Sequence, residues 1–138
     1  MELEFALNPE QSDLDCIRNG IYTYNRQHLP QGAVTPVGCF ARDTHGNIVA
    51  GLTGQMFSNT VFVEYLWVSE AQRGTRLGSR LIHLLEEQVK AHDVTHLYLD
   101  TYSFQALDFY LKLGFSKVGE YTGFPSEGIV KYFLQKQL

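Results

Sequence analysis

Residues 69–82 read SEAQRGTRLGSRLI and join a polar segment to the start of an apolar helical pattern. The first turn of a helix exposes backbone amides without intrahelical partners, and the helix dipole adds about half a positive charge there. Glycines let a ligand approach the backbone, and arginines can donate charge-assisted hydrogen bonds to phosphate oxygens. The stretch therefore predicts an anion site at the start of a helix over 75–92, although an ordinary turn with solvated arginines would have the same composition.

Two common nucleotide-binding motifs are missing from this stretch. It does not match G-x-x-x-x-G-K-[ST], so nucleoside triphosphate hydrolysis is not indicated. It does not match G-x-G-x-x-G either, so a dinucleotide-binding fold is not indicated. If an anion binds here, it belongs to another class of ligand.

The rest of the chain alternates strand patterns with two further helix patterns. Asn8 and Pro9 are typical of a helix start, and Ser103 is expected to cap a helix that ends at Gly114. The predicted elements, in chain order, are a strand at 2–7, a helix that stops before Pro30, strands at 37–43, 48–57 and 61–68, a helix at 75–92, a strand at 95–102, a helix at 104–113, and strands at 115–124 and 129–138. This order, β-α-β-β-β-α-β-α-β-β, predicts an α+β fold whose mixed, mostly antiparallel sheet is flanked by helices.

The predicted strand at 61–68 contains one acid among apolar residues. Simple alternation predicts two faces, Val61, Val63, Tyr65 and Trp67 on one and Phe62, Glu64, Leu66 and Val68 on the other. Glu64 would then lie on an otherwise apolar face. It is either a functional acid beside a cleft or a glutamate on a solvated sheet face.

Length and composition predict a single soluble domain over residues 1–138. The net charge of -4 argues against nucleic acid as a partner, because phosphate backbones are bound by basic surfaces. No apolar run is long enough to span a membrane, and no membrane partner is expected. Cys16 and Cys39 do not form a disulfide or zinc pattern, so we expect two buried, reduced thiols in a cytoplasmic protein. His92 and His96 lack further ligands at a zinc spacing, so no metal site is predicted.

Two segments together resemble a known family. VSEAQRGTRLG (68–78) resembles the pyrophosphate-binding motif of the GNAT superfamily of N-acetyltransferases, and ALDFYLKLGF (106–115) resembles its late A-x-x-x-Y-x-x-x-G-F motif. The predicted element order also matches this family. The resemblance implies acetyl-CoA as co-substrate and direct attack by a primary amine, from a small molecule or a protein, in a ternary complex. It also implies that strand 61–68 splays from strand 95–102, with the pantetheine arm of acetyl-CoA in the gap.

The resemblance implies a set of residues that bind acetyl-CoA. Main-chain amides near Leu66, Trp67 and Val68 would polarise the thioester carbonyl. The pyrophosphate would lie on the helix start, and the full implied set is Leu66, Trp67, Val68, Arg73, Gly74, Thr75, Arg76, Leu77, Gly78, Ser79, Ser103 and Tyr110. Two positions depart from the family pattern: Arg76 replaces a central glycine, and Ser103 replaces an asparagine.

The same resemblance implies the catalytic residues. Tyr110 matches the family tyrosine that protonates the leaving thiolate, although it could also be a core aromatic. Glu64 is the candidate base, on the expectation that burial beside the gap raises its pKa. Asp100 and Tyr102 are weaker candidates for contact with the amine.

Other functions and the nature of the acceptor pocket stay open at this stage. The departures at Arg76 and Ser103 are compatible with a non-catalytic acyl-CoA-binding or sensor module, and a dimeric interaction domain is a third hypothesis. A homodimer is left open for the enzyme as well. The aromatic residues Tyr65, Trp67, Tyr121 and Phe124 either line the acceptor pocket or belong to the core.

Overall fold

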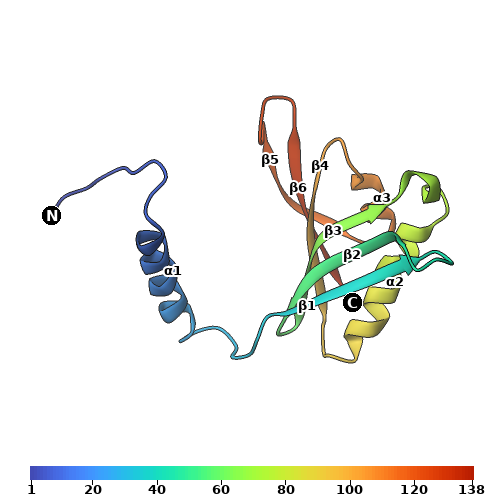
Figure 1. Cartoon of the computed structure of the whole chain (residues 1–138), viewed down its shortest axis with the longest axis horizontal. Coiled ribbons are helices and arrows are strands. Elements are labelled where there is room, and N and C mark those ends of the chain that lie inside the picture. Colours follow the sequence, from blue (N-terminus) through green and yellow to red (C-terminus); the bar gives the residue numbers. More distant parts are fainter. The chain divides into compact units, whose positions relative to one another are not determined.

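The computed structural model describes residues 1–138, and their contacts gather in two compact units, Met1–Gly32 and Ala33–Leu138. Each unit is described by itself (Figure 1). The sequence predicted one domain over the whole chain. No helix in either unit is both long enough and apolar enough to cross a membrane.

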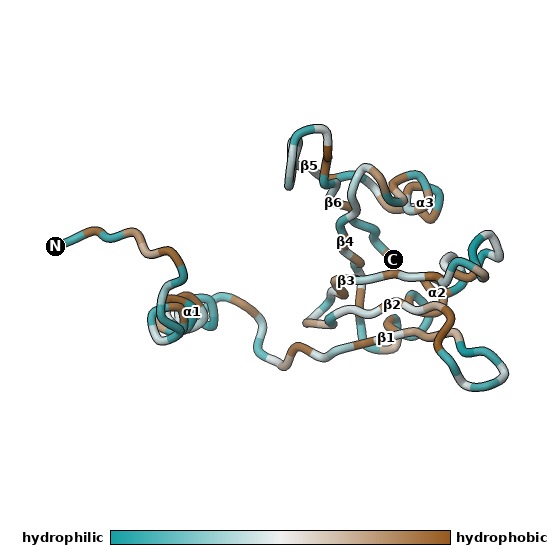
Figure 2. The backbone as a smooth tube through the Cα atoms, turned by 45° about the horizontal axis from the view of Figure 1, so that its top comes forward, coloured by the Kyte–Doolittle hydropathy of each residue, from teal (hydrophilic) through white to brown (hydrophobic).

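The first unit contains one helix, α1, over Gln11–Asn25. The strand predicted at 2–7 is wrong, because those residues form no regular structure. A strand needs a partner for its amides and carbonyls, and this unit contains no other strand. Asn8 is also not the helix cap: its φ is +59°, and the capping position is Glu10. The apolar residues of α1 are exposed, and Figure 2 shows them interleaved with polar ones.

The second unit is a six-stranded sheet with helices, so the predicted α+β class is confirmed. Its strands run in the spatial order β1-β2-β3-β4-β6-β5. The elements are β1 Thr35–Arg42, β2 Ile48–Phe57, β3 Thr60–Val68, the short 3-10 helix η1 Glu70–Gln72, α2 Leu77–Lys90, β4 His96–Tyr102, α3 Leu107–Lys112, β5 Ser116–Thr122 and β6 Val130–Gln137. Every neighbouring pair of strands is antiparallel except β3 and β4.

The parallel contact between β3 and β4 is short. Its paired residues are Thr60 with His96, Val61 with Leu97, and Phe62 with Tyr98, after which the two strands no longer pair. β4 continues to pair with β6 as far as Tyr102, and β3 continues to pair with β2 as far as Val68. The sheet therefore opens between β3 and β4, as the family resemblance implied for strands 61–68 and 95–102.

A β-bulge shifts the register of β3 at Glu64. Thr53 of β2 pairs with Tyr65, whereas the next residue, Gly54, pairs with Val63, so Glu64 is an extra residue in β3. The simple alternation predicted for this strand is therefore wrong beyond Val63. Tyr65 is 73% exposed, whereas its neighbour Leu66 packs against the core.

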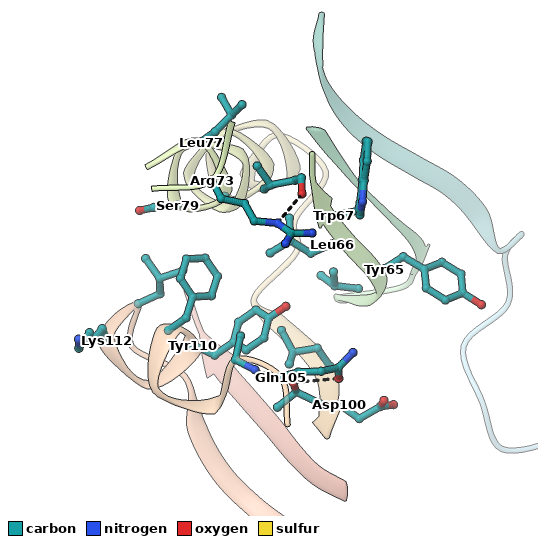
Figure 3. A pocket seen from close by; sticks show the side chains of 18 of the residues that line it. Tyr65, Leu66, Trp67, Arg73, Leu77, Ser79, Asp100, Gln105, Tyr110 and Lys112 are labelled. Carbon is teal, nitrogen blue, oxygen red and sulfur yellow. Dashed lines mark hydrogen bonds between the residues drawn. The ribbon is translucent and has the colours of Figure 1, made fainter. Parts of the chain in front are cut away.

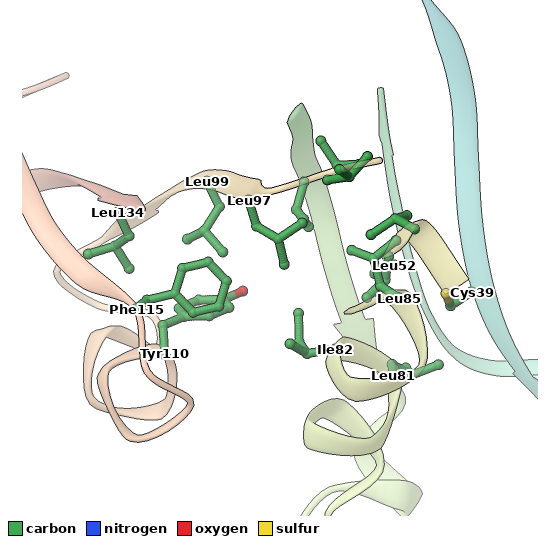
Figure 4. Packing of buried hydrophobic residues seen from close by; sticks show 14 of the residues in the cluster. Cys39, Leu52, Leu81, Ile82, Leu85, Leu97, Leu99, Tyr110, Phe115 and Leu134 are labelled. Carbon is green, nitrogen blue, oxygen red and sulfur yellow. The ribbon is translucent and has the colours of Figure 1, made fainter. Parts of the chain in front are cut away.

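The core lies between the sheet and the two helices α2 and α3. Figure 4 shows Leu81, Ile82 and Leu85 of α2 facing apolar side chains of the strands. Tyr110 and Phe115 extend the same cluster toward Leu99 and Leu134 (Figure 4). The most deeply buried side chains are Leu52, Val61, Ile82, Leu85, Leu97 and Leu134. Burial of such a side chain contributes about 1.5–3 kcal/mol, so this cluster holds both helices on one face of the sheet.

A part-buried lysine ties the two helices to the sheet. The ammonium of Lys136, on β6, donates to Glu86 Oε1 of α2 at 2.7 Å and to the carbonyl oxygen of Leu113 at 2.6 Å. Leu113 follows the last residue of α3, so its carbonyl is one of those that a helix end leaves without an intrahelical partner. The contact positions α3 beside α2.

We predict that Gly54→Ala destabilises the protein by about 1–3 kcal/mol. A Cβ at this position would collide with the backbone carbonyl oxygen of Phe62, and backbone at a bulge cannot move aside without losing pairing. The free energy of unfolding, measured by chemical denaturation, checks this. Gly119→Ala in β5 is the matched control, because the nearest atom to its new Cβ would be 3.9 Å away. Equal stability of the Gly54→Ala variant and the wild type would contradict the account of the bulge.

Candidate functional site

The opening between β3 and β4 continues into a cleft of about 1070 Å³. Residues from β3, β4 and the starts of α2 and α3 line it, with side chains on both sides of the gap (Figure 3). Of the residues predicted to bind acetyl-CoA or to act in catalysis, the cleft brings together Glu64, Leu66, Trp67, Val68, Arg73, Gly74, Arg76, Leu77, Gly78, Ser79 and Tyr110. Thr75 and Ser103 do not line it.

One side of the cleft is formed by the start of α2. The amides of Leu77, Gly78 and Ser79 are the first of this helix, and no side chain caps them. Together with the helix dipole they form a positive end that suits an anion. The guanidinium of Arg73 lies beside them and donates from Nε to the carbonyl oxygen of Val68 at 3.2 Å. Figure 3 shows this contact at the end of β3.

Arg76 stands at the capping position of α2 with a φ of +64°. This left-handed conformation is one that glycine adopts without steric cost and that costs other residues about 1–2 kcal/mol. The geometry explains why a glycine is expected there. Arg76 keeps the turn and adds an exposed guanidinium to the cleft lining.

Thr75 and Ser103 have structural contacts outside the cleft. Thr75 Oγ1 donates to the carbonyl oxygen of Gln72 at 2.6 Å and so closes the loop before α2. Ser103 was expected to cap a helix, but α3 begins only at Leu107, with Ala106 at its cap. The Ser103 hydroxyl instead accepts from the amide of Val130 at 3.1 Å, which fastens the end of β4 to the start of β6.

The side chain of Tyr110 belongs to both the core and the cleft. The residue is 8% exposed, and its ring packs edge-on against Phe109 and Phe115. Its hydroxyl points into the cleft (Figure 3). Burial, followed by the negative charge of Asp100, raises the pKa of Tyr110 to about 12. The two sequence interpretations, core aromatic and proton donor, are therefore compatible in one residue.

The two acids of the cleft lie in different settings. Glu64 sits at the bulge of β3, is exposed, and accepts from Gln55 Nε2 at 2.9 Å. The buried setting expected for Glu64 is therefore not found. Asp100 on β4 is more enclosed, with its side chain 29% exposed, and its Oδ1 lies 3.6 Å from the ammonium of Lys131.

The sequence did not single out several residues that line the cleft. They are Gln72, Leu99, Thr101, Gln105, Ala106, Phe109, Lys112, Leu113 and Lys131. Phe109 and Lys112 are close to Tyr110 in the sequence of α3, so their place in the cleft could be inferred from that of Tyr110. The sequence around Lys131 contains nothing that indicates a place in the cleft. Lys131 reaches the cleft only through the pairing of β6 with β4, where it lies opposite Tyr102.

The chain is similar to known acetyltransferases in sequence. The family model described as "Acetyltransferase (GNAT) family" matches residues 7–115. Blasticidin-S acetyltransferase of Streptomyces morookaense is 31% identical over 100 residues, which cover 72% of this chain and 73% of the relative.

Solved structures agree with these similarities. The crystal structure of an acetyltransferase from Bacillus cereus ATCC 14579 has a TM-score of 0.88 and 28% identity, with 98% of each chain covered. An aminoglycoside 6'-N-acetyltransferase solved in complex with coenzyme A has a TM-score of 0.66 over 74% of this chain and 72% of that chain. The latter shares 18% identity, so it shows a common fold alone.

We predict that Arg76→Gly is more stable than Arg76→Ala by about 1 kcal/mol. Both variants remove the guanidinium, so their difference reports the left-handed backbone at the start of α2. Thermal and chemical denaturation of the two variants side by side measures it. If Arg76→Ala is as stable as Arg76→Gly, the backbone at this position is not strained.

Proposed function

Because this chain belongs to the GNAT acetyltransferase family, we propose that it is an acetyl-CoA-dependent N-acetyltransferase. The acetyl group would pass to a primary amine by direct attack in a ternary complex. The observation that carries this proposal is the cleft itself, where an uncapped helix start faces a buried tyrosine hydroxyl across an open sheet. A relative named blasticidin-S acetyltransferase supports the transfer of an acetyl group.

The cleft fits the parts of acetyl-CoA. The amides of residues 77–79, with Arg73 and Arg76, would hold the pyrophosphate. The β3 backbone that β4 leaves unpaired would bind the pantetheine amides as an added strand would. Lys112 on α3 adds a further cation to the lining. The structure of a coenzyme A complex with the same fold supports this assignment.

The reaction needs three proton and charge adjustments. An ammonium must lose a proton before its nitrogen can attack, and Glu64 would accept that proton directly or through a water. The nitrogen then bonds to the thioester carbon, and amides near Leu66, Trp67 and Val68 would stabilise the oxyanion. When the carbon–sulfur bond breaks, the Tyr110 hydroxyl would donate its proton to the thiolate, and the second proton that the attacking nitrogen loses on becoming an amide would restore the Tyr110 hydroxyl.

The alternative is a non-catalytic acyl-CoA-binding module that keeps the fold. Arg76 in place of a glycine and Ser103 outside the cleft are the observations that favour it. Tyr110 favours catalysis, because its hydroxyl faces the cleft. The enzyme would act in the cytoplasm, where both cysteines would stay reduced. Cys39 is buried as expected, whereas Cys16 is exposed. A homodimer is compatible with this proposal.

We predict that acetyl-CoA stabilises the folded protein by about 2.7 kcal/mol at about 100 times its dissociation constant. A thermal-shift titration measures this stabilisation, and a thiol-release assay with a panel of primary amines measures turnover. Binding with amine-dependent release of coenzyme A supports the enzyme. Binding without release above background hydrolysis supports the non-catalytic module. No stabilisation at millimolar acetyl-CoA contradicts both.

We predict that Tyr110→Phe lowers kcat by about 100-fold and leaves acetyl-CoA affinity unchanged. The variant keeps the ring in the core and removes only the proton donor, so its stability should change little. Tyr98→Phe is the matched control: the Tyr98 hydroxyl accepts from Gln135 Nε2 at 3.2 Å, outside the cleft. A normal kcat in Tyr110→Phe would remove this tyrosine from the mechanism.

The pKa of Tyr110, raised to about 12, predicts the basic side of the pH profile. A raised tyrosine pKa keeps the hydroxyl protonated to higher pH, so the donor is not lost between about pH 8 and about pH 10. We therefore expect kcat to show no decline over that range. A decline with a midpoint near the ordinary tyrosine pKa of about 10, present in the wild type and absent in Tyr110→Phe, would show that the hydroxyl ionises early.

A further inference from the structure

Lys131 forms a cationic centre on the β4–β6 side of the cleft. Its ammonium lies 3.6 Å from Asp100 Oδ1 and 5.6 Å from the ring centroid of Tyr102. The rings of Phe124 and Phe133 lie 5.4 Å and 5.9 Å from the same nitrogen. A carboxylate and three aromatic faces therefore hold this charge in place.

The hydrogen-bonding capacity of Lys131 is unused. An ammonium has three donors, and a separation of 3.6 Å from Asp100 is an ion pair without a hydrogen bond. No other group in the chain accepts from Lys131, whereas Lys136 on the same strand donates to two partners. The Lys131 side chain is 22% exposed and lines the cleft, so its donors are available to a ligand.

The Asp100–Lys131 pair lies away from the cations assigned to the phosphates. Arg73 and Arg76 flank the start of α2, and Lys112 lies on α3. Figure 3 shows Lys112 and Asp100 on the same side of the cleft but at its two ends, with Tyr110 between them. The negative charge of Asp100 acts on the Tyr110 hydroxyl, so the pair is near the proposed proton donor.

We propose that Asp100 and Lys131 bind the two charged groups of an amino-acid-like acceptor, Asp100 its amine and Lys131 its carboxylate. This inference rests on the proposed N-acetyltransferase function. The nitrogen and the carboxylate carbon of an α-amino acid are about 2.5 Å apart, and the opposed charges of the pair are 3.6 Å apart. A zwitterion can therefore meet both partners at once.

The surroundings of the pair favour this class of acceptor over others. A polycation would place an additional positive charge beside Lys131, and two like charges at this range repel. A simple amine without a carboxylate would leave the Lys131 donors unused. Tyr65 and Trp67, which are 73% and 52% exposed, also line the cleft, from its β3 side.

The test compares acceptors that differ only in the carboxylate. Each of a set of L-amino acids is assayed beside its amide and its decarboxylated amine, with spermidine as the polycation. We expect kcat/KM for the preferred amino acid to exceed that for its amide by at least about tenfold. This is the ratio expected when one hydrogen bond to a charged group is lost. In Lys131→Met the preference should disappear through a higher KM for the amino acid, with the KM for acetyl-CoA unchanged.

Lys117→Met is the matched control for the substitution. Lys117 also pairs with a carboxylate, Glu120, and lies 5.3 Å from the ring centroid of Tyr132, but it is outside the cleft. This variant should keep the amino-acid preference. A preference that survives in Lys131→Met, or a wild type that favours amides, decarboxylated amines or spermidine, overturns the inference while the proposed acetyltransferase function stands.

Calorimetry separates this inference from the proposed function. The same ligands are titrated into the protein saturated with coenzyme A, and binding is measured without turnover. Amino-acid binding that is tight in the wild type and Lys117→Met and weak in Lys131→Met supports the pair even if no amine is acetylated. If no amino acid of the set binds more tightly than its amide, the inference is wrong whatever the activity.

Discussion

The early end of pairing between β3 and β4 is the constraint on which the site depends. After Phe62 and Tyr98 the two parallel strands separate, and backbone groups that a continuous sheet would pair are left to solvent or ligand. Parallel strands also end at the same edge of a sheet. The helices that follow them, α2 and α3, therefore start on either side of the opening, and residues of both helices line one cleft.

The bulge at Glu64 decides which side chains face this cleft. One extra residue in β3 turns Leu66 toward the core and leaves Tyr65 and Trp67 exposed. Without it, the alternation of the strand would place the aromatic pair in the core and the leucine outside. The Glu64 carboxylate does not depend on the bulge for its exposure, because it follows buried Val63 and continues the exposed face of Phe62. The β3 side of the cleft is thus shaped by one register shift rather than by the composition of the strand.

Sequence reasoning succeeded where the signal is local. The first three strands of the sheet, β1 to β3, the start of α2 and the position of Tyr110 depend on alternation, turn residues and short motifs. The bounds of β2 agree with those predicted. It failed for residues 2–7, whose alternation had no partner strand in the first unit. It also failed for Ser103, whose hydroxyl pairs with Val130 on a strand 27 residues later.

The sequence by itself determined the family, the α+β class and the glycine-containing turn before α2, because these rest on the order of residues along short segments. Only the tertiary structure decided which charges meet. Lys131 comes beside Asp100 because β6 inserts between β4 and β5, and the exposure of Tyr65 and Trp67 follows from a bulge that pairing with β2 creates. Both depend on contacts between strands. The two residues of such a contact lie in different segments of the sequence, so neither segment alone determines the contact.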